Sequence, residues 1–328
     1  MKRFIVASFL VFPLLLSSFA QKEEIQYPAL AKELIQMRAV DQKYRIRYGK
    51  MIQKGKRDTE KFKTLVYKLI DIDRSNTARM QEIVAQYGWP TYDKVGRRGS
   101  NAAWILVQHA DRNPVFQIQC LPLLKAAVDE GQASTVDYAY LYDRVQLAQG
   151  YKQKYATQST THPISNEPFF QALEDEAKVQ QNREAMGIKR TVVEYAESLG
   201  FDYSIPTLAE AEQRAQQFAA TYTENIQAAR AAMKKGDYQT AADHYILATA
   251  CDGYTQMEDY VETARAMALA KHKRSHRGFA YLIKAGLRGW EGIFEVDSNP
   301  EFAYLKAASP KNWQDLMIVV EALQRESP

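Results

Sequence analysis

A short polar segment follows one of the most apolar stretches in the first half of the chain. Residues 102–107 read Ala-Ala-Trp-Ile-Leu-Val, and Gln108, His109 and Asp111 come directly after them. Burying polar groups of this kind without partners costs about 1–3 kcal/mol each, and more when they are charged. Apolar stripes elsewhere in this half are interrupted at Asp41, Asp73 and Asn76. We therefore predict that these side chains meet in one shared polar centre.

His109 is the residue of this segment that can transfer a proton near neutral pH. As a general acid or base it needs a carboxylate to orient its ring, and the candidates are Asp41, Asp111 and Asp143. The alternatives are structural. His109 can be a core histidine that donates to a helix-end carbonyl, and Asp111 can cap the turn before Pro114. A single histidine with no nucleophile motif favours the structural alternative for His109.

Arginine and amide side chains accompany the candidate acids. Arg45 lies one helical turn after Asp41, either as a structural ion pair or as an anion-binding arginine held by the carboxylate. Asp143 and Arg144 are neighbours on an expected helix, so they point in different directions and pair with different partners. In an enzyme, Arg45 or Arg144 would stabilise developing negative charge. The side chains predicted to contact a polar ligand, although buried amides often only satisfy loop backbone, are Gln42, Arg45, Gln108, Gln117, Arg144 and Gln158.

The sequence predicts neither a metal site nor a cofactor. His109 is the one histidine beside candidate acids, and neither the His-Glu-x-x-His spacing of zinc enzymes nor a Cys-x-x-Cys pair occurs. The two cysteines, Cys120 and Cys251, fall in different predicted domains. An oxidising compartment would permit a bridge between them, but two separate buried thiols is the preferred prediction.

The first twenty residues have the organisation of a secretory signal peptide. Met1-Lys2-Arg3 is basic, residues 4–16 are apolar, and Ser18-Phe19-Ala20 supplies a small-x-small cleavage site. The apolar stretch is too short for a membrane span, and no cysteine follows it to carry a lipid anchor. We predict a periplasmic or secreted protein.

Composition and charge describe a globular protein with a mixed surface. Hydrophobic residues make up 46% of the chain and charged residues 25%, which is the balance of ordinary folded domains. Removing residues 1–20 lowers the net charge from +4 to +2, because Lys2 and Arg3 are lost. This near-neutral total provides no argument for nucleic acid or an anionic membrane as a partner.

Helical periodicity dominates the chain. Apolar residues recur at every third or fourth position over residues 30–48 and 62–87, with acids in a gap of each stripe. We expect Asp58 to cap the second of these helices and Ser100 to cap a short helix that ends at the polar segment. Residues 151–165 are rich in Thr, Ser, Gln and Tyr without a helical period, which predicts a loop or a small hairpin.

Beyond Thr207 the sequence becomes rich in alanine. Residues 236–248 read Gly-Asp-Tyr-x-x-Ala-Ala-x-x-Tyr-x-x-Ala, with small residues at the steps where two antiparallel helices pack closely. This spacing resembles the second helix of a tetratricopeptide repeat, with residues 225–235 as the first, and a looser pair follows at 260–270 and 276–287. Two repeats must bury their open face on a neighbour, for which we expect the first domain. Their concave surface is predicted to bind a protein or peptide partner.

Seven motifs of the first half occur in a recognisable order. They are Asp41-Gln42-x-x-Arg45, Gly88-Trp89-Pro90-Thr91, Gln108-His109-Ala110-Asp111, Phe116-Gln117, Leu141-Tyr142-Asp143-Arg144, Tyr155-Ala156-Thr157-Gln158 and Asn182-Arg183-Glu184-Ala185-Met186-Gly187-Ile188. Together they resemble the uncharacterised bacterial domain-of-unknown-function family six-six-two-four, over residues 30–195. The family pattern has Gly where Ala156 stands, which puts a turn with positive φ in doubt here. The resemblance implies no activity.

The sequence thus predicts an all-α protein in three parts. These are a signal peptide (1–20), a helical domain that holds the polar cluster and a short irregular or hairpin segment (21–203), and tetratricopeptide-like helical repeats (204–328). Ligand or protein binding, or scaffolding, is the first functional hypothesis. The second is a hydrolase or lyase that uses His109, and the third is a cluster that only specifies helix packing. An enzyme requires an open cleft in which His109 reaches both a carboxylate and solvent, a binding module also requires a cleft, and the third hypothesis requires a closed cluster.

Overall fold

The computed structural model describes residues 25–163, 165–251 and 253–326, so the predicted signal peptide lies outside the described residues. Over this part, thirteen α-helices and a single two-stranded sheet confirm the prediction of an all-α fold. The helices and strands of the first half are α1 (Pro28–Gln53), α2 (Glu60–Tyr87), α3 (Tyr92–Gln108), α4 (Pro114–Asp129), α5 (Thr135–Ala148), β1 (Ser159–Thr161), β2 (Pro168–Phe170), α6 (Val179–Ala185) and α7 (Val192–Leu199). Those of the second half are α8 (Leu208–Lys234), α9 (Tyr238–Ala248), α10 (Met257–Leu269), α11 (Gly278–Leu287), α12 (Ala303–Ala308) and α13 (Pro310–Glu326).

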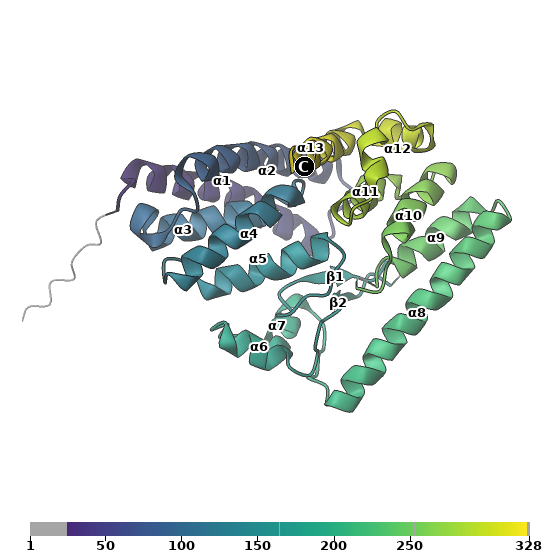
Figure 1. The fold of residues 1–328 in the computed structure, drawn as a ribbon, viewed down its shortest axis with the longest axis horizontal. Helices are drawn as coiled ribbons and strands as arrows, with labels where there is room; N and C mark the ends of the chain where they lie inside the picture. The colour runs from purple at the N-terminus through teal and green to yellow at the C-terminus, as the bar shows by residue number, and fades with distance from the viewer. Residues whose placement is uncertain (1–24, 164, 252, 327–328) are drawn as a thin grey trace, which may run out of the picture.

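Helices α1–α5 form a layered bundle at one end of the molecule (Figure 1). α1 packs on α2 and α3, and α4 packs on α5. The apolar stripes read from the sequence supply the core, where Leu34, Met80 and Leu106 are essentially inaccessible to solvent. A helix with apolar residues at every third or fourth position buries one face, which is why these stripes face inward.

Two helix starts differ from the sequence expectations. α2 is capped by Thr59 rather than Asp58, because the Thr59 hydroxyl accepts the N–H of Phe62. α3 begins at Tyr92 and continues through a kink at Gly96 (φ 70°), so Ser100 lies buried inside the helix instead of capping it. Glycine tolerates this positive φ without the strain of a side chain, and the helix therefore resumes after a residue that sequence patterns treat as a break.

Residues 151–206 connect the bundle to the second half through a β-hairpin and two short helices. β1 and β2 pair antiparallel, with Ser159 opposite Phe170 and Thr161 opposite Pro168. A small hydrophobic cluster that includes Phe170, Val179 and Val192 holds the hairpin against α6 and α7. The hairpin alternative predicted for residues 151–165 is therefore the observed one, with its second strand just beyond that range.

Ala156 adopts the left-handed backbone conformation that the family's glycine would favour. Its φ is 49° and its side chain is fully buried. The turn is thus retained without glycine, at the steric cost that an L-residue pays at positive φ, about 1–2 kcal/mol. The structure therefore contains the turn with positive φ that the absence of glycine had put in doubt.

Substitutions at Ala156 should separate backbone strain from packing. Ala156→Val is expected to lower the free energy of unfolding by about 3 kcal/mol or more, because a β-branched side chain is strained at positive φ and has no space there. Ala156→Gly is expected to change it by less than about 1 kcal/mol, since relief of strain offsets the loss of a buried methyl. Urea denaturation of both variants measures this, and a Gly variant as unstable as the Val variant would refute the strain argument.

The second half is a succession of antiparallel helices. α8 packs on α9, α9 on α10 and α10 on α11, around a core in which Tyr245, Tyr260 and Leu282 are almost completely buried. α8 is longer than the expected segment 225–235 and begins at Leu208, where the side chains of Thr207 and Glu210 form a reciprocal capping box. Its alanine-rich first half sustains the helix although little of it is buried.

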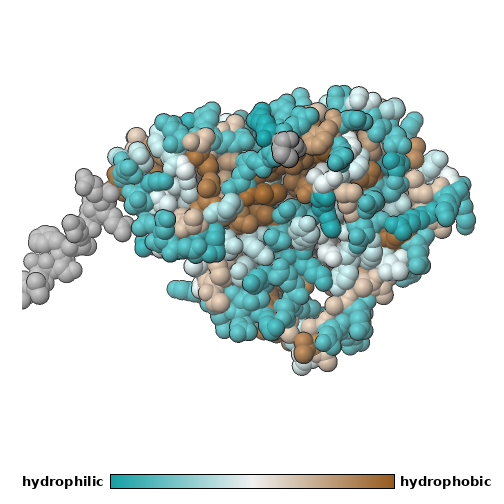
Figure 2. Space-filling view, in the orientation of Figure 1, coloured by the Kyte–Doolittle hydropathy of each residue, from teal (hydrophilic) through white to brown (hydrophobic). Residues whose placement is uncertain are grey.

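The C-terminal helix packs against helices of the first half of the chain. In Figure 1, α13 lies beside α2 and α4, and Val115 at the start of α4 belongs to the same hydrophobic core as the second-half helices. Figure 2 shows hydrophobic side chains gathered on this face where α4 and α13 lie, and Leu123 and Ile318 are among the exposed large hydrophobic residues of these two helices.

Cys120 and Cys251 are both buried thiols, the preferred of the two alternatives. None of the helices in the described part of the chain is long and apolar enough to cross a membrane.

Candidate functional site

The structure brings His109 and Asp41 together from helices that are distant in sequence. His109 is the C-cap residue of α3, and Asp41 lies in the middle of α1 with its carboxylate completely buried. The ring Nδ1 of His109 and Oδ2 of Asp41 are 2.9 Å apart. The other ring nitrogen, Nε2, has no hydrogen-bond partner among the described residues, and 21% of the His109 side chain remains exposed. His109 therefore reaches both a carboxylate and solvent.

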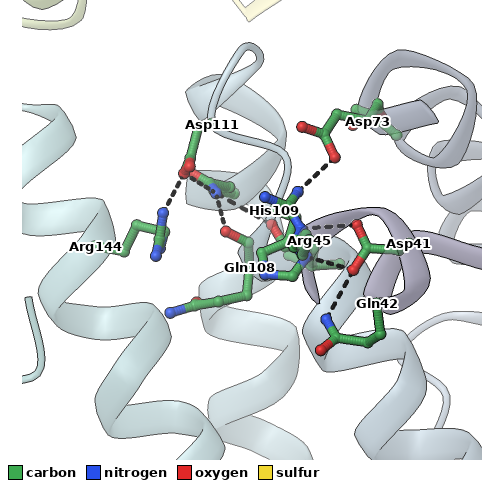
Figure 3. Close-up of polar contacts among 11 residues, drawn as sticks. Asp41, Gln42, Arg45, Asp73, Gln108, His109, Asp111 and Arg144 are labelled. Atoms are coloured by element: carbon green, nitrogen blue, oxygen red, sulfur yellow. Dashed lines mark hydrogen bonds and ion pairs between the residues drawn. The ribbon is translucent and has the colours of Figure 1, made fainter. Parts of the chain in front are cut away.

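Arg45 links two carboxylates beside this pair (Figure 3). Its Nε donates to Oδ1 of Asp41 at 2.9 Å, and its Nη2 donates to Oδ1 of Asp73 on α2 at 2.5 Å. Gln42 adds a third donor to Asp41, at 2.8 Å. The one-turn spacing of Asp41 and Arg45 on α1 and the packing of α1 on α2 place these groups in contact. They form a continuous chain from Asp73 through Arg45 and Asp41 to His109.

The two carboxylates of this chain titrate in opposite directions. Burial works against ionisation of Asp41, but its hydrogen bonds with His109, Arg45 and Gln42 outweigh it and lower the pKa of Asp41. For Asp73, burial dominates over the attraction of Arg45, and the neighbouring Asp41 charge adds to it, so that its pKa is raised to about 6. Asp41 is therefore the permanently ionised partner of His109, and Asp73 can exchange a proton near neutral pH.

The raised pKa of Asp73 predicts a pH-dependent stability. Because the folded pKa of about 6 exceeds the unfolded value of about 3.9, the folded state binds the proton more tightly, and stability is lost as pH rises from about 4 to about 6. Asp73→Asn removes this loss. Its stability relative to wild type should rise by about 1–3 kcal/mol between pH 4.5 and pH 7. Urea denaturation at both pH values measures the change, with the exposed Asp71→Asn on the same helix as control; an unchanged difference would contradict the assignment.

Asp111 forms a second polar group on the other side of His109. Nη1 of Arg144 lies 2.5 Å from Oδ1 of Asp111, and Nε2 of Gln117 donates to the same oxygen at 3.2 Å. More than half of the Asp111 side chain (58%) is exposed; the local desolvation that opposes its ionisation is outweighed by the charge of Arg144, which lowers the pKa of Asp111. The capping alternative for Asp111 is not the observed one, because its carboxylate accepts from Arg144 and Gln117 and from no backbone N–H among the described residues.

Two buried polar atoms near this group lack a partner among the described residues. They are Oε1 of Gln108, a residue with 5% exposure, and Nε of Arg144. The amide nitrogen of Gln108 donates to the backbone oxygen of Tyr140, which leaves its oxygen as an unused acceptor. A buried donor and a buried acceptor without partners each cost about 1–3 kcal/mol. Both atoms are closed off from solvent, so an enclosed water molecule would satisfy them, whereas a ligand would reach them only after neighbouring side chains moved.

A known family model matches the part of the chain that contains this site. Residues 28–206 match the model of a family described as Family of unknown function (DUF6624), which covers more than half of the chain. The chain belongs to DUF6624. The resemblance read from the seven motifs is thereby confirmed, whereas the match ends before α8 and the tetratricopeptide interpretation of the later helices stays a prediction. No curated protein and no solved structure matches the chain.

Asp143 of the DUF6624 domain lies apart from the His109 cluster. Its fully buried carboxylate accepts the backbone N–H groups of Lys154, Tyr155 and Thr157 and the Thr157 hydroxyl, at 2.8–3.1 Å. Burial raises its pKa to about 6 against these donors. Asp143 is therefore not available to orient His109, because the loop takes up its oxygens. Gln158 also belongs to this loop, where its amide donates to Thr157.

Sequence reasoning missed a second polar cluster, which lies next to the site and joins the two halves of the chain. Asp315 of α13 is completely buried and pairs with Arg74 of α2 at 2.7 Å and with Arg112, which directly follows Asp111. The signal was present, because Asp315 interrupts the apolar stripe of α13, just as Asp41 interrupts that of α1. Among the described residues no group of three or more His, Cys, Asp or Glu side chains is arranged to hold a metal ion.

Proposed function

We propose that the DUF6624 domain is a hydrolase or lyase in which His109 acts as general acid and base. The observation that carries the proposal is the 2.9 Å contact between Nδ1 of His109 and the fully buried Asp41, on a ring whose Nε2 has no partner among the described residues. A carboxylate held on one ring nitrogen with the other directed to solvent is the arrangement that acid–base catalysis requires. Ligand binding, the first hypothesis from the sequence, is a step that such a site also performs.

The proton positions follow from the charges. An ionised Asp41 can only accept, so the neutral imidazole donates through Nδ1 and keeps its lone pair on Nε2. Nε2 then removes a proton from a water molecule or a substrate hydroxyl, and the buried Asp41 carboxylate stabilises the imidazolium that forms. In hydrolysis the deprotonated oxygen bonds to the electrophilic atom of the substrate, and as the bond to the leaving group breaks, the proton passes from Nε2 to that group.

Arg144 is the better candidate for holding the anionic part of a substrate. Arg45 already donates to Asp41 and Asp73 through two of its nitrogens, so it positions the Asp41–His109 pair. Arg144 uses Nη1 for Asp111, and 25% of its side chain remains exposed. The same arginine also supports binding without turnover as a second candidate function.

A substrate panel compared with His109→Ala tests the proposal. Wild-type protein is assayed on nitrophenyl esters, phosphates and glycosides, and His109→Ala is expected to lower kcat/KM at least about 10²-fold on any substrate turned over. His244→Ala is the matched control, because His244 is also half-buried and bonded through Nδ1 at 2.9 Å, to Asn225. If neither the wild-type protein nor His109→Ala turns over any substrate, and His109→Ala only lowers the melting temperature, the cluster is structural and the proposal fails.

Two broader proposals accompany the site. We propose that the protein works outside the cytoplasm, on the basis of the leader-like residues 1–20. We also propose that the repeat-like helices bind a protein or peptide partner. The loop that contains Pro163 covers part of their surface, since Arg274 donates to the backbone oxygen of Pro163 at 2.5 Å. Cell fractionation tests the first, and crosslinking of the intact protein in envelope extracts tests the second.

A further inference from the structure

The turn between α1 and α2 projects from the core and concentrates positive charge. Over residues 42–68 no side chain is classed as buried, whereas Asp41 and Leu69 on either side of this segment are buried. Residues 43–68 contain ten Lys and Arg against the two acids Asp58 and Glu60, a net charge of +8. The near-neutral net charge after residue 20 is therefore the sum of a strongly basic hairpin end and an acidic remainder of the chain.

A groove runs between the two helices in this hairpin end, which we call the α1–α2 groove. Its volume is about 630 Å³, which lies in the range of small-molecule sites. Six cations line it, and none of them forms an ion pair within the described chain: Arg47, Lys50, Lys54, Lys56, Lys61 and Lys68. The lining residues include no acid. Unpaired cations around a concavity attract an anionic ligand and hold it by charge complementarity.

The floor of the α1–α2 groove is apolar. Tyr44 and Met51 of α1 and Leu65 of α2 line it and are each only half-buried. Tyr48 stacks on Phe62 with ring centroids 5.3 Å apart, which holds the two helices together beside the groove. Cations at the rim and apolar side chains at the floor match a ligand that is itself amphiphilic.

We propose that the α1–α2 groove binds anionic phospholipid at a membrane surface. Phosphate headgroups would pair with the lysine ammonium groups at the rim, and the glycerol and upper acyl region would cover Met51 and Leu65. Lysines suit this role because their long apolar stems lie along the hydrocarbon while the charge stays in the headgroup layer. Single-stranded nucleic acid fits less well, because the ring that lines the groove, Tyr44, lies under the guanidinium of Arg47, and Tyr48 and Phe62 beside the groove stack on each other.

Vesicle cosedimentation tests the proposal with the full chain. Wild-type protein is expected to sediment with phosphatidylcholine vesicles that contain about 30 mol% phosphatidylglycerol and not with pure phosphatidylcholine. Neutralising two rim lysines, in Lys50→Gln with Lys61→Gln, should weaken this binding about 30-fold. The matched control neutralises the exposed Lys189 and Lys235, which lie outside the groove, and should bind as wild type does.

A floor variant and a soluble competitor distinguish lipid from other polyanions. Met51→Gln leaves every charge in place, and it should weaken vesicle binding several-fold if the floor contacts lipid. Equal loss of binding in the Lys189/Lys235 control would show that only total charge matters, and would overturn the proposal. So would groove-dependent binding of inorganic polyphosphate or a single-stranded oligonucleotide by a protein that ignores the anionic vesicles.

Discussion

Replacing Asp41 by asparagine is expected to lower kcat/KM by about 10²–10⁴-fold on any substrate that the protein turns over. The amide keeps the shape of the side chain but loses the charge that fixes the Nδ1–H tautomer of His109 and stabilises its protonated ring. Because Asp41 is fully buried and lies 2.9 Å from Nδ1, water has no access there to compensate for the lost negative charge. Kinetics of wild type and variant measure the effect, and ¹⁵N NMR of the ring reports the tautomer without a substrate.

The matched control for this experiment is Asp73→Asn. Both variants remove a carboxylate partner of Arg45, but only Asp41 touches His109. We therefore expect a large loss in the first variant and a loss of less than about tenfold in the second. Equal losses in the two variants would mean that the arrangement of Arg45, and not the Asp41–His109 pair, governs activity. An unchanged ring tautomer in Asp41→Asn would refute the orienting role directly.

Asp315→Ala is expected to lower the free energy of unfolding by about 2–4 kcal/mol. The wild-type carboxylate is completely buried and compensates Arg74 and Arg112, whose side chains are only 24% and 25% exposed. Removing it leaves two guanidinium groups close together, short of solvent and without a counter-charge. Because Arg74 lies on α2 and Asp315 on α13, the loss weakens the contact between the two halves of the chain.

Urea denaturation followed by tryptophan fluorescence measures the Asp315 effect. Asp129→Ala is the control, since Asp129 pairs only with Lys125 at a site where 59% of its side chain is exposed, and such pairs contribute less than about 1 kcal/mol. Asp315→Asn should fall between the two, because it keeps hydrogen bonds but not charge. If Asp315→Ala unfolds no earlier than Asp129→Ala, the Asp315 cluster does not stabilise the fold.

Short-range patterns in the sequence determined most of the helices and several members of the cluster around His109, whereas Asp143 and Gln158, predicted together with them, lie in a separate loop contact. Apolar periodicity located α1 and α2, and the acid in the gap of a stripe identified Asp41 and Asp73 as buried or half-buried groups that need partners. These inferences succeed because helix periodicity and the cost of burying a charge depend on residues within a few turns of one another. The same reasoning, applied to α13, would have identified Asp315.

Which partner each group takes was decided only by the tertiary structure. His109 and Asp41 are 68 positions apart, and nothing local chooses Asp41 over Asp143. The packing of α1 on α3 makes that choice, while the loop after α5 encloses Asp143. Ala156 likewise adopts a positive φ that its own preference opposes, because contacts around a fully buried position outweigh a local steric cost of about 1–2 kcal/mol. Periodicity fixes which face of a helix is buried, whereas pairing depends on how separate helices pack, and that is a property of the whole chain.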